Sequence, residues 1–133
     1  MRFSALLTLT AAAGCSALVG DPSWVTDRPP LPACGDVTIE GAERVPANLS
    51  RCLAAGRLGA GAELIVRQRT PADGLPSDAI LRVLPDGGGE FFLHINPERN
   101  SSGTWEWHRC NAIEFTDPDE GVTFSDCDRG DSG

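Results

Sequence analysis

The chain has 133 residues and a formal charge of −8, and all eleven of its basic side chains are arginine. This length fits a single domain with short flanking segments. An acidic surface argues against binding to nucleic acid and against electrostatic attraction to anionic lipid headgroups.

The first fourteen residues have the anatomy of an export signal. Met1 and Arg2 form a short cationic start, and residues 3–13 are uncharged and largely apolar. A helix of this length, at about 1.5 Å per residue, reaches only about half of a bilayer core of about 30 Å. We therefore predict a leader at residues 1–14 rather than a membrane-spanning helix.

The predicted leader ends in Ala12-Ala13-Gly14-Cys15, which resembles the bacterial lipobox. The resemblance implies that a lipid is transferred to the Cys15 thiol and that the chain is cut before this residue. The product would be anchored to the cell membrane through Cys15 and face the extracytoplasmic side. Ala12 departs from the lipobox, where Leu is commoner. The alternative is an ordinary signal peptide, cut after Ala13 or Ala17.

The cysteine count supports the lipid anchor. Five cysteines leave one thiol unpaired in an exported protein, and lipid on Cys15 accounts for it. The other four allow three pairings into two disulfides. We favour Cys34 with Cys52 and Cys110 with Cys127, because each pair closes a short loop and would contribute about 3 kcal/mol. The cysteine spacing contains no zinc-binding pair, so no metal is expected.

Composition divides the mature chain into a linker, a domain and a tail. Residues 15–33 contain four prolines, which indicates a flexible tether that holds the domain away from the membrane. Trp24 and Val25 are the apolar exceptions: a plain linker is favoured for them, and the alternatives are that they pack back on the domain or enter the membrane interface. Residues 34–128 are expected to form the single domain, and residues 129–133 a disordered tail.

Hydrophobic periodicity predicts one helix and several strands within the domain. Val45, Leu49 and Leu53 share one helical face with Cys52, and Pro46 suits the first turn of this helix. The strand segments show alternation or runs of Val, Ile and Leu. The expected elements are a strand at 36–40, a helix from 46 to 56 or 59, strands at 62–69, 78–84, 90–95 and 104–110, and short segments at 111–115 and 122–124.

These elements predict an α+β fold: an antiparallel sheet of four to six strands, with the helix packed on one face and two disulfides. The second face of such a sheet is not polar throughout. A partner or the tether is therefore expected to cover it.

Several segments between Cys34 and Cys110 carry a resemblance. They are Cys34-Gly35, Arg51-Cys52-Leu53-Ala54-Ala55, Ala62-Glu63-Leu64-Ile65-Val66, Thr70 followed by Asp73-Gly74-Leu75-Pro76, and Arg82-Val83. This set resembles a group of small, uncharacterised lipoproteins of actinobacteria. The resemblance implies a lipoprotein with a disulfide-containing domain, and it implies no activity or catalytic residue. The loop at residues 70–76 departs from the Thr-x-Glu-Gly-Asp-Pro-like loop of that group.

The densest group of chemically capable side chains is Trp105-Glu106-Trp107-His108. Strand alternation places the two tryptophans on one face, and Glu106 and His108 on the other. The tryptophans would suit a sugar or a peptide, which makes these four residues a candidate binding surface. The favoured interpretation is structural, with both tryptophans in the core. No nucleophile accompanies Glu106 and His108, so no catalytic residue is predicted.

Two further features predict no site. His94 lies on the strand face opposite Phe91 and Leu93, where a surface histidine is expected. The acidic stretch at residues 117–128 fails the calcium-loop pattern at its fifth, sixth and twelfth positions. We therefore predict no cofactor.

Taken together, the sequence predicts a membrane-anchored lipoprotein of the cell envelope. Its domain is expected to be a non-enzymatic binding or structural module, with an envelope protein or a glycan as partner. The alternative is a small envelope hydrolase, or an inhibitor of a secreted hydrolase acting through the loop at residues 71–76. No common hydrolase or nucleotide-binding motif is present.

Overall fold

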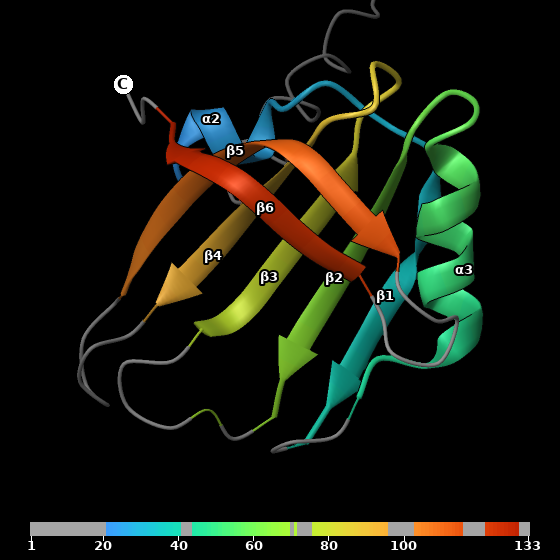
Figure 1. The fold of residues 1–133 in the computed structure, drawn as a ribbon. Helices are drawn as coiled ribbons and strands as arrows, with labels where there is room; N and C mark the ends of the chain where they lie inside the picture. The colour runs from blue at the N-terminus through green and yellow to red at the C-terminus, as the bar shows by residue number, and fades with distance from the viewer. Residues whose placement is uncertain are drawn as a thin grey trace, which may run out of the picture.

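The computed structural model describes residues 21–40, 44–69, 71, 76–95, 103–115 and 122–130. Six strands form one sheet, and their order in space follows their order in the chain (Figure 1). The strands are β1 (Ala33–Ile39), β2 (Ala62–Gln68), β3 (Pro76–Val83), β4 (Gly89–Ile95), β5 (Thr104–Phe115) and β6 (Val122–Arg129). Two helices lie in the described part of the chain, α2 (Ser23–Thr26) and α3 (Ala47–Gly56).

The sheet is mixed. β1 and β2 run parallel, whereas every other neighbouring pair is antiparallel. The prediction of an antiparallel sheet is therefore wrong for this first pair. A parallel pair needs a long crossover connection, and α3 lies within the stretch that joins β1 to β2.

Most of the predicted elements are present with shifted ends. β1 begins at Ala33, before the expected start, and β5 continues without a break through residues 111–115. β6 reaches Arg129, and the Gly130 N–H donates to the Trp107 carbonyl at 2.7 Å. Arg129 therefore belongs to the sheet, and Gly130 is hydrogen-bonded to it, although the sequence predicts a tail from residue 129 onward.

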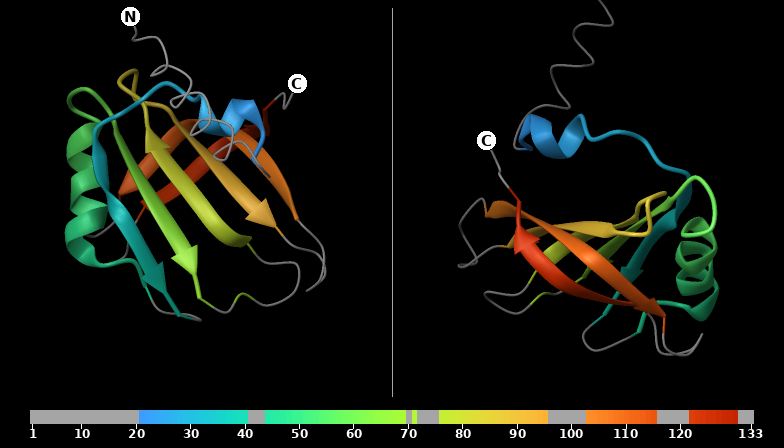
Figure 2. Two further views of the ribbon diagram at one scale, coloured as in Figure 1. Left: turned by 180° about the vertical axis from the view of Figure 1, so that it is seen from behind. Right: turned by 45° about the horizontal axis from the view of Figure 1, so that its top comes forward.

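The β5–β6 hairpin curls over one face of the sheet (Figure 2). Its far end reaches the end of α3, where the Arg57 guanidinium lies 4.9 Å from the centre of the Phe115 ring. Arg57 also donates to the Ile113 carbonyl at 3.4 Å. We call the face beneath this hairpin the inner face.

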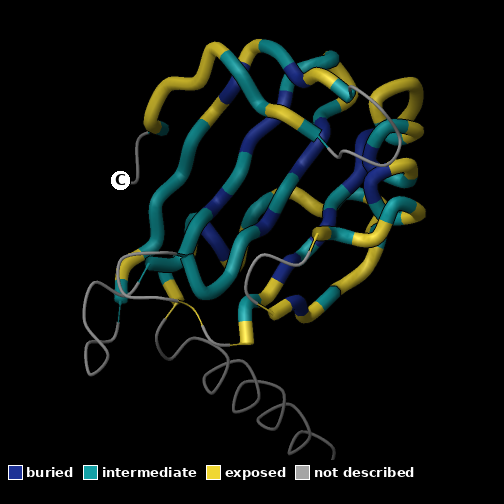
Figure 3. Tube along the Cα trace, turned by 60° about the horizontal axis from the view of Figure 1, so that its bottom comes forward, coloured by how far each residue is buried: buried dark blue, intermediate teal, exposed yellow. Residues whose placement is uncertain are grey.

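The main hydrophobic cluster lies on the inner face. Leu53 of α3 is fully buried there with Leu64 and Val83, and Ile113 of β5 joins the same cluster. Leu49 and Val45, which share the predicted helical stripe with Leu53, pack against it. The buried stretches run through the middle of the sheet, whereas exposed residues gather at its ends and along α3 (Figure 3).

A second, smaller cluster lies on the opposite face, which we call the outer face. Val25 of α2 is only 2% exposed and packs with Ile80 and Phe92. Trp24 and Trp107 lie against this cluster. Residues 21–33 fall within the segment that the sequence predicts as a tether, and their packing supports the alternative that Trp24 and Val25 return to the domain.

Two disulfides staple the fold, with the pairing that the sequence favours. Cys34 and Cys52 join β1 to α3, across 18 positions in sequence. Cys110 and Cys127 face each other on β5 and β6, across 17 positions. Each bond closes a loop for which chain entropy predicts a contribution of about 3 kcal/mol.

No helix in the described part of the chain is long and apolar enough to cross a membrane.

Candidate binding pocket

The outer face carries three rows of side chains that run across β2, β3 and β4, and two of these rows continue onto β5. Each row consists of residues that face one another in register on neighbouring strands. They are an ionic row (Glu63, Arg82, Glu90), an apolar row (Ile65, Ile80, Phe92, Trp107) and a polar row (Arg67, Asp78, His94, Trp105).

The apolar row holds α2 on the sheet. The Trp24 ring stacks on Phe92 with centroids 6.0 Å apart, and Phe92 stacks in turn on Trp107 at 5.9 Å. Burial of the Val25 side chain stabilises the packing of α2 on the sheet by about 1.5 kcal/mol. A helix of four residues has no stability of its own, so this packing is what forms α2.

The ionic row is centred on Arg82, which is 1% exposed. Its Nε donates to Glu90 Oε2 at 2.7 Å, and its Nη1 donates to Glu63. Its Nη2 donates to the Pro29 carbonyl. The second oxygen of Glu90 accepts from Trp107 Nε1 at 3.1 Å. This buried cation is therefore matched by two carboxylates, as burial of a charge requires.

Arg28 ties the N-terminal segment to the ionic row. Its Nε and Nη2 donate to the two oxygens of Glu63 at 2.9 and 3.0 Å. Its Nη1 donates to the Val25 carbonyl at 2.6 Å, and the Glu63 N–H donates to the Pro32 carbonyl at 2.8 Å. These contacts fix the segment that leads into β1 against the sheet.

Glu63 is ionised by its neighbours. Burial alone would raise the pKa of this carboxyl, but hydrogen bonds and charges from Arg28 and Arg82 outweigh burial and hold the pKa below its ordinary value of 4.5. Glu63 is therefore charged at neutral pH.

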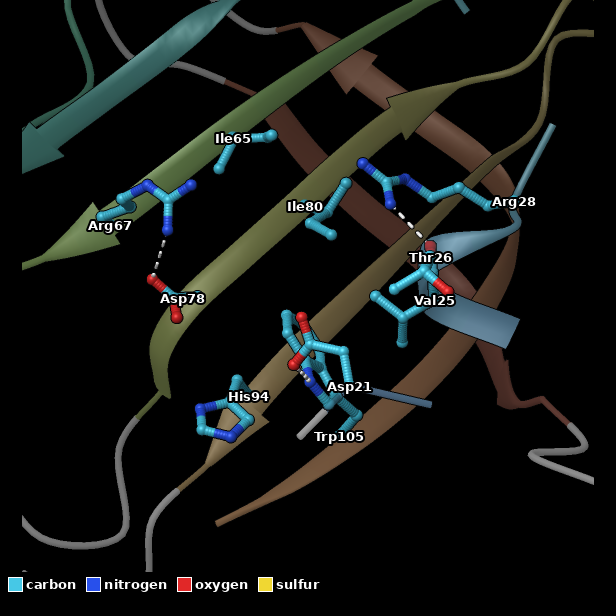
Figure 4. A pocket seen from close by; sticks show the side chains of 10 residues that line it. All are labelled: Asp21, Val25, Thr26, Arg28, Ile65, Arg67, Asp78, Ile80, His94 and Trp105. Carbon is cyan, nitrogen blue, oxygen red and sulfur yellow. Dashed lines mark hydrogen bonds and ion pairs between the residues drawn. The ribbon is translucent and has the colours of Figure 1, made fainter. Parts of the chain in front are cut away.

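A pocket of about 220 Å³ lies between the polar row and the N-terminal segment (Figure 4). Ile65 and Ile80 contribute apolar surface from the sheet, and Val25 contributes it from α2. Asp78 and Asp21 bring carboxylates from opposite sides, as the close view shows.

Arg67 lines the pocket but is bound from outside it. Its Nε donates to Asp36 Oδ1 at 2.9 Å and its Nη2 donates to Asp36 Oδ2 at 3.0 Å. These hydrogen bonds, from a residue that does not line the pocket, raise the pKa of Arg67. The Asp78 carboxylate is farther away, with Oδ1 at 3.6 Å from Arg67 Nη1.

The far end of the pocket is formed by Trp105 and His94, whose rings lie 5.0 Å apart. Trp105 Nε1 donates to Asp21 Oδ1 at 3.1 Å. The Ser77 hydroxyl, at a register irregularity between β3 and β4, donates to the His94 carbonyl at 3.2 Å and lies 2.9 Å from His94 Nδ1. The Ser77 hydroxyl therefore has two acceptors within reach on His94, the carbonyl oxygen and Nδ1, and the imidazole tautomer sets the direction of the second contact.

The structure divides the predicted surface of Trp105, Glu106, Trp107 and His108 between the two faces. Trp105 reaches the pocket. Trp107 is a packing residue of the outer face, held between Phe92 and the ionic row.

Glu106 and His108 lie on the inner face, away from the pocket. His108 Nε2 is 3.2 Å from Glu106 Oε1, and the imidazole stacks on Phe91 with centroids 4.8 Å apart. Arg129 adds a distant ion pair to Glu106 at 3.7 Å. A carboxyl group and an imidazole therefore meet on the inner face, whereas the two tryptophans lie on the outer face.

Apart from Trp105, no residue that lines the pocket was predicted from the sequence as a site residue, and the polar ones that were missed include Asp21, Arg67, Asp78 and His94. Arg67, Asp78 and His94 lie on three different strands. They become neighbours on one face only once the register of two hairpins is known. Asp21 lies in a segment with no periodic signal. The one sequence signal for this segment was the apolar pair Trp24 and Val25, which indicates that the segment could pack on the domain.

Among the described residues, no group of three or more His, Cys, Asp or Glu side chains could hold a metal ion. Cys15, the predicted lipid site, and residues 116–121 of the acidic stretch lie outside the described residues.

Comparison with protein-family models, with curated proteins and with solved structures found no match to this chain.

Proposed function

We propose that this chain is a lipid-anchored extracytoplasmic lipoprotein whose domain is a non-enzymatic binding module. The observation that carries the binding function is the pocket on the outer face, formed between the sheet and the N-terminal segment. Apolar surface with a few polar groups around it is the usual composition of a small-molecule site. The anchor rests on the predicted leader and on Cys15.

The packing of the N-terminal segment on the sheet shortens the expected tether. Asp21 is hydrogen-bonded to Trp105, so the part free to act as a linker reduces to residues 16–20. The six Cα–Cα steps from Cys15 to Asp21 span at most about 21 Å when the chain is fully extended. Under this proposal the pocket is held within a short distance of the membrane surface rather than far above it.

The hydrolase alternative has one observation in its favour, the 2.9 Å contact between the Ser77 hydroxyl and His94 Nδ1. A serine nucleophile must give its proton to the histidine. Here the hydroxyl also has the His94 carbonyl as an acceptor at 3.2 Å, and this competes with transfer of its proton to Nδ1. We therefore prefer binding over hydrolysis. Ester hydrolysis by the purified protein that is lost in Ser77→Ala would reverse this preference.

The inhibitor alternative rests on the loop at residues 71–76, of which residues 72–75 lie outside the described residues. A rigid loop flanked by a disulfide would favour an inhibitor, but neither disulfide joins this loop.

The anchor is tested by expressing the full chain in a bacterium and measuring its mass and its partition into detergent. We expect the mass of the chain from Cys15 onward plus acyl groups, with partition into the detergent phase. Cys15→Ser should remain unprocessed or unlipidated and stay in the aqueous phase. An unmodified Cys15 in the wild-type protein would refute the anchor.

A further inference from the structure

The two arginines of the pocket are neutralised by carboxylates that lie outside it. Arg28 is held by both oxygens of Glu63, and Arg67 is held by both oxygens of Asp36. Neither Glu63 nor Asp36 lines the pocket. An anionic ligand would therefore have to compete with two-point ion pairs that are already formed.

The two carboxylates of the pocket keep free acceptor atoms. The Asp78 carboxylate accepts no hydrogen bond from the residues that the structure describes, and the nearest cation, Arg67 Nη1, is 3.6 Å from its Oδ1. Its side chain is 30% exposed. Asp21 uses Oδ1 to accept from Trp105, and no contact within the described ranges occupies its Oδ2. With the arginines matched elsewhere, the pocket has an excess of negative charge.

The volume and the apolar surface limit the size of a ligand. The pocket of about 220 Å³ is below the range of about 300–1,000 Å³ typical of drug-sized ligands. Ile65, Ile80 and Val25 provide a surface for a short hydrocarbon chain.

We infer that this pocket binds a small primary amine, with its ammonium group on the free oxygens of Asp78 and Asp21 and its hydrocarbon body against Ile80 and Ile65. This inference rests on the proposed binding function and specifies the ligand class. An ammonium group supplies three donors and no acceptor, which fits a site whose free groups are acceptors. The chain has no lysine, so no side-chain ammonium of its own can occupy the site.

The indole N–H signals of the tryptophans provide a direct test by NMR. Trp105 Nε1 donates to Asp21, so an ammonium on Asp21 should shift the Trp105 signal. Trp107 Nε1 donates to Glu90 in the ionic row and serves as an internal control. The intact mature protein, kept in a non-ionic detergent, is titrated to millimolar concentrations of butylammonium chloride, butan-1-ol or sodium butyrate. Butylammonium should shift the Trp105 signal saturably, whereas the neutral and anionic analogues should not.

Two variants locate the site. Asp78→Asn should weaken butylammonium binding about fivefold, because a partly exposed ion pair contributes at most about 1 kcal/mol. Asp21→Asn should weaken it by a similar factor. Asp86→Asn is the matched control: its carboxylate is 66% exposed, pairs weakly with Arg109 at 3.9 Å and does not line this pocket, so affinity should not change.

Three results would overturn the inference: no saturable shift of the Trp105 signal, binding of butyrate in preference to butylammonium, or equal affinities in wild type, Asp78→Asn and Asp21→Asn. Lipid mass and detergent partition are measured on the same protein. Absence of amine binding in a lipidated protein overturns this ligand class alone. Amine binding by a chain with unmodified Cys15 overturns the anchor alone.

Discussion

Arg28 and Glu63 lie 35 positions apart in the chain and form a two-point ion pair on the outer face of the sheet. The pair joins the segment that precedes β1 to the centre of the ionic row, where Glu63 also meets Arg82. Both side chains are largely shielded from water, with exposed fractions of 19% for Arg28 and 14% for Glu63.

Removal of this pair should detach the N-terminal segment. Arg28→Ala is expected to lower the free energy of unfolding by about 1–2 kcal/mol, the range for charged hydrogen bonds after a discount for partial exposure. It should also increase amide exchange at residues 23–28. Arg69→Ala removes an exposed pair to Glu40 at 3.6 Å and should change stability by less than about 0.5 kcal/mol. Equal effects of the two variants in urea denaturation would contradict this role of Arg28.

Acid should loosen the same segment. The pKa of Glu63 is lowered in the folded protein, so its contribution to stability is complete above the ordinary value of 4.5 and is lost as the pH falls through the lower folded value. Urea midpoints should therefore decrease with acidification below about pH 4.5. Glu63→Gln should reduce this slope, whereas Glu114→Gln, at an exposed position, should leave it unchanged.

Leu53 and Leu58 provide a matched pair for the inner face. Leu53 is fully buried against β2 and β3, whereas Leu58 is 88% exposed. Leu53→Ala should cost about 2–5 kcal/mol, through lost transfer free energy and an unfilled cavity. Leu58→Ala should fall within about 0.5 kcal/mol of wild type. Thermal or urea unfolding measures both, and a small effect at Leu53 would show that α3 is not part of the core.

Gly89 allows the curled hairpin to approach β4. A Cβ atom at this position would lie 2.4 Å from Ile113 Cδ1 and 2.7 Å from Phe124 Cε2. Gly89→Ala should therefore destabilise the fold by about 1–3 kcal/mol, as overpacking does. Gly59 has no atom within 4 Å of its Cβ position, so Gly59→Ala is the control. Comparable unfolding midpoints for these two variants would argue against the close packing of β5 on β4.

The regular parts of the fold could be predicted from the sequence because their signals are local. The alternation of apolar residues in β4 and the apolar stripe of α3 arise because one side of each element packs against the hydrophobic core. The odd cysteine count and the short loops led to the observed disulfide pairing. The parallel pairing of β1 with β2 could not be predicted from alternation, since a strand carries the same pattern in either direction.

The pocket depends on relationships that have no local signal. Asp78 and His94 face each other only because the β3–β4 hairpin has one particular register. Asp21 reaches Trp105 across 84 positions because α2 packs on the sheet, and four helical residues show no periodicity in the sequence. Trp105 was identified as a candidate, and alternation placed Glu106 and His108 on the other face, but no local pattern indicated Asp21, Asp78 and His94 as its companions.

The packing of the N-terminal segment also decides how the domain bears mechanical load. A pull applied at residue 21 does not act directly on β1, the edge strand, because Val25, Arg28 and Pro32 lie between the point of attachment and that strand. The force is passed to β2 and β3 through the contacts of Glu63 and Ile80. These contacts must break one after another before the edge of the sheet is strained. The segment would thus yield first under tension, and the disulfide at Cys34 would limit how far the unravelling proceeds.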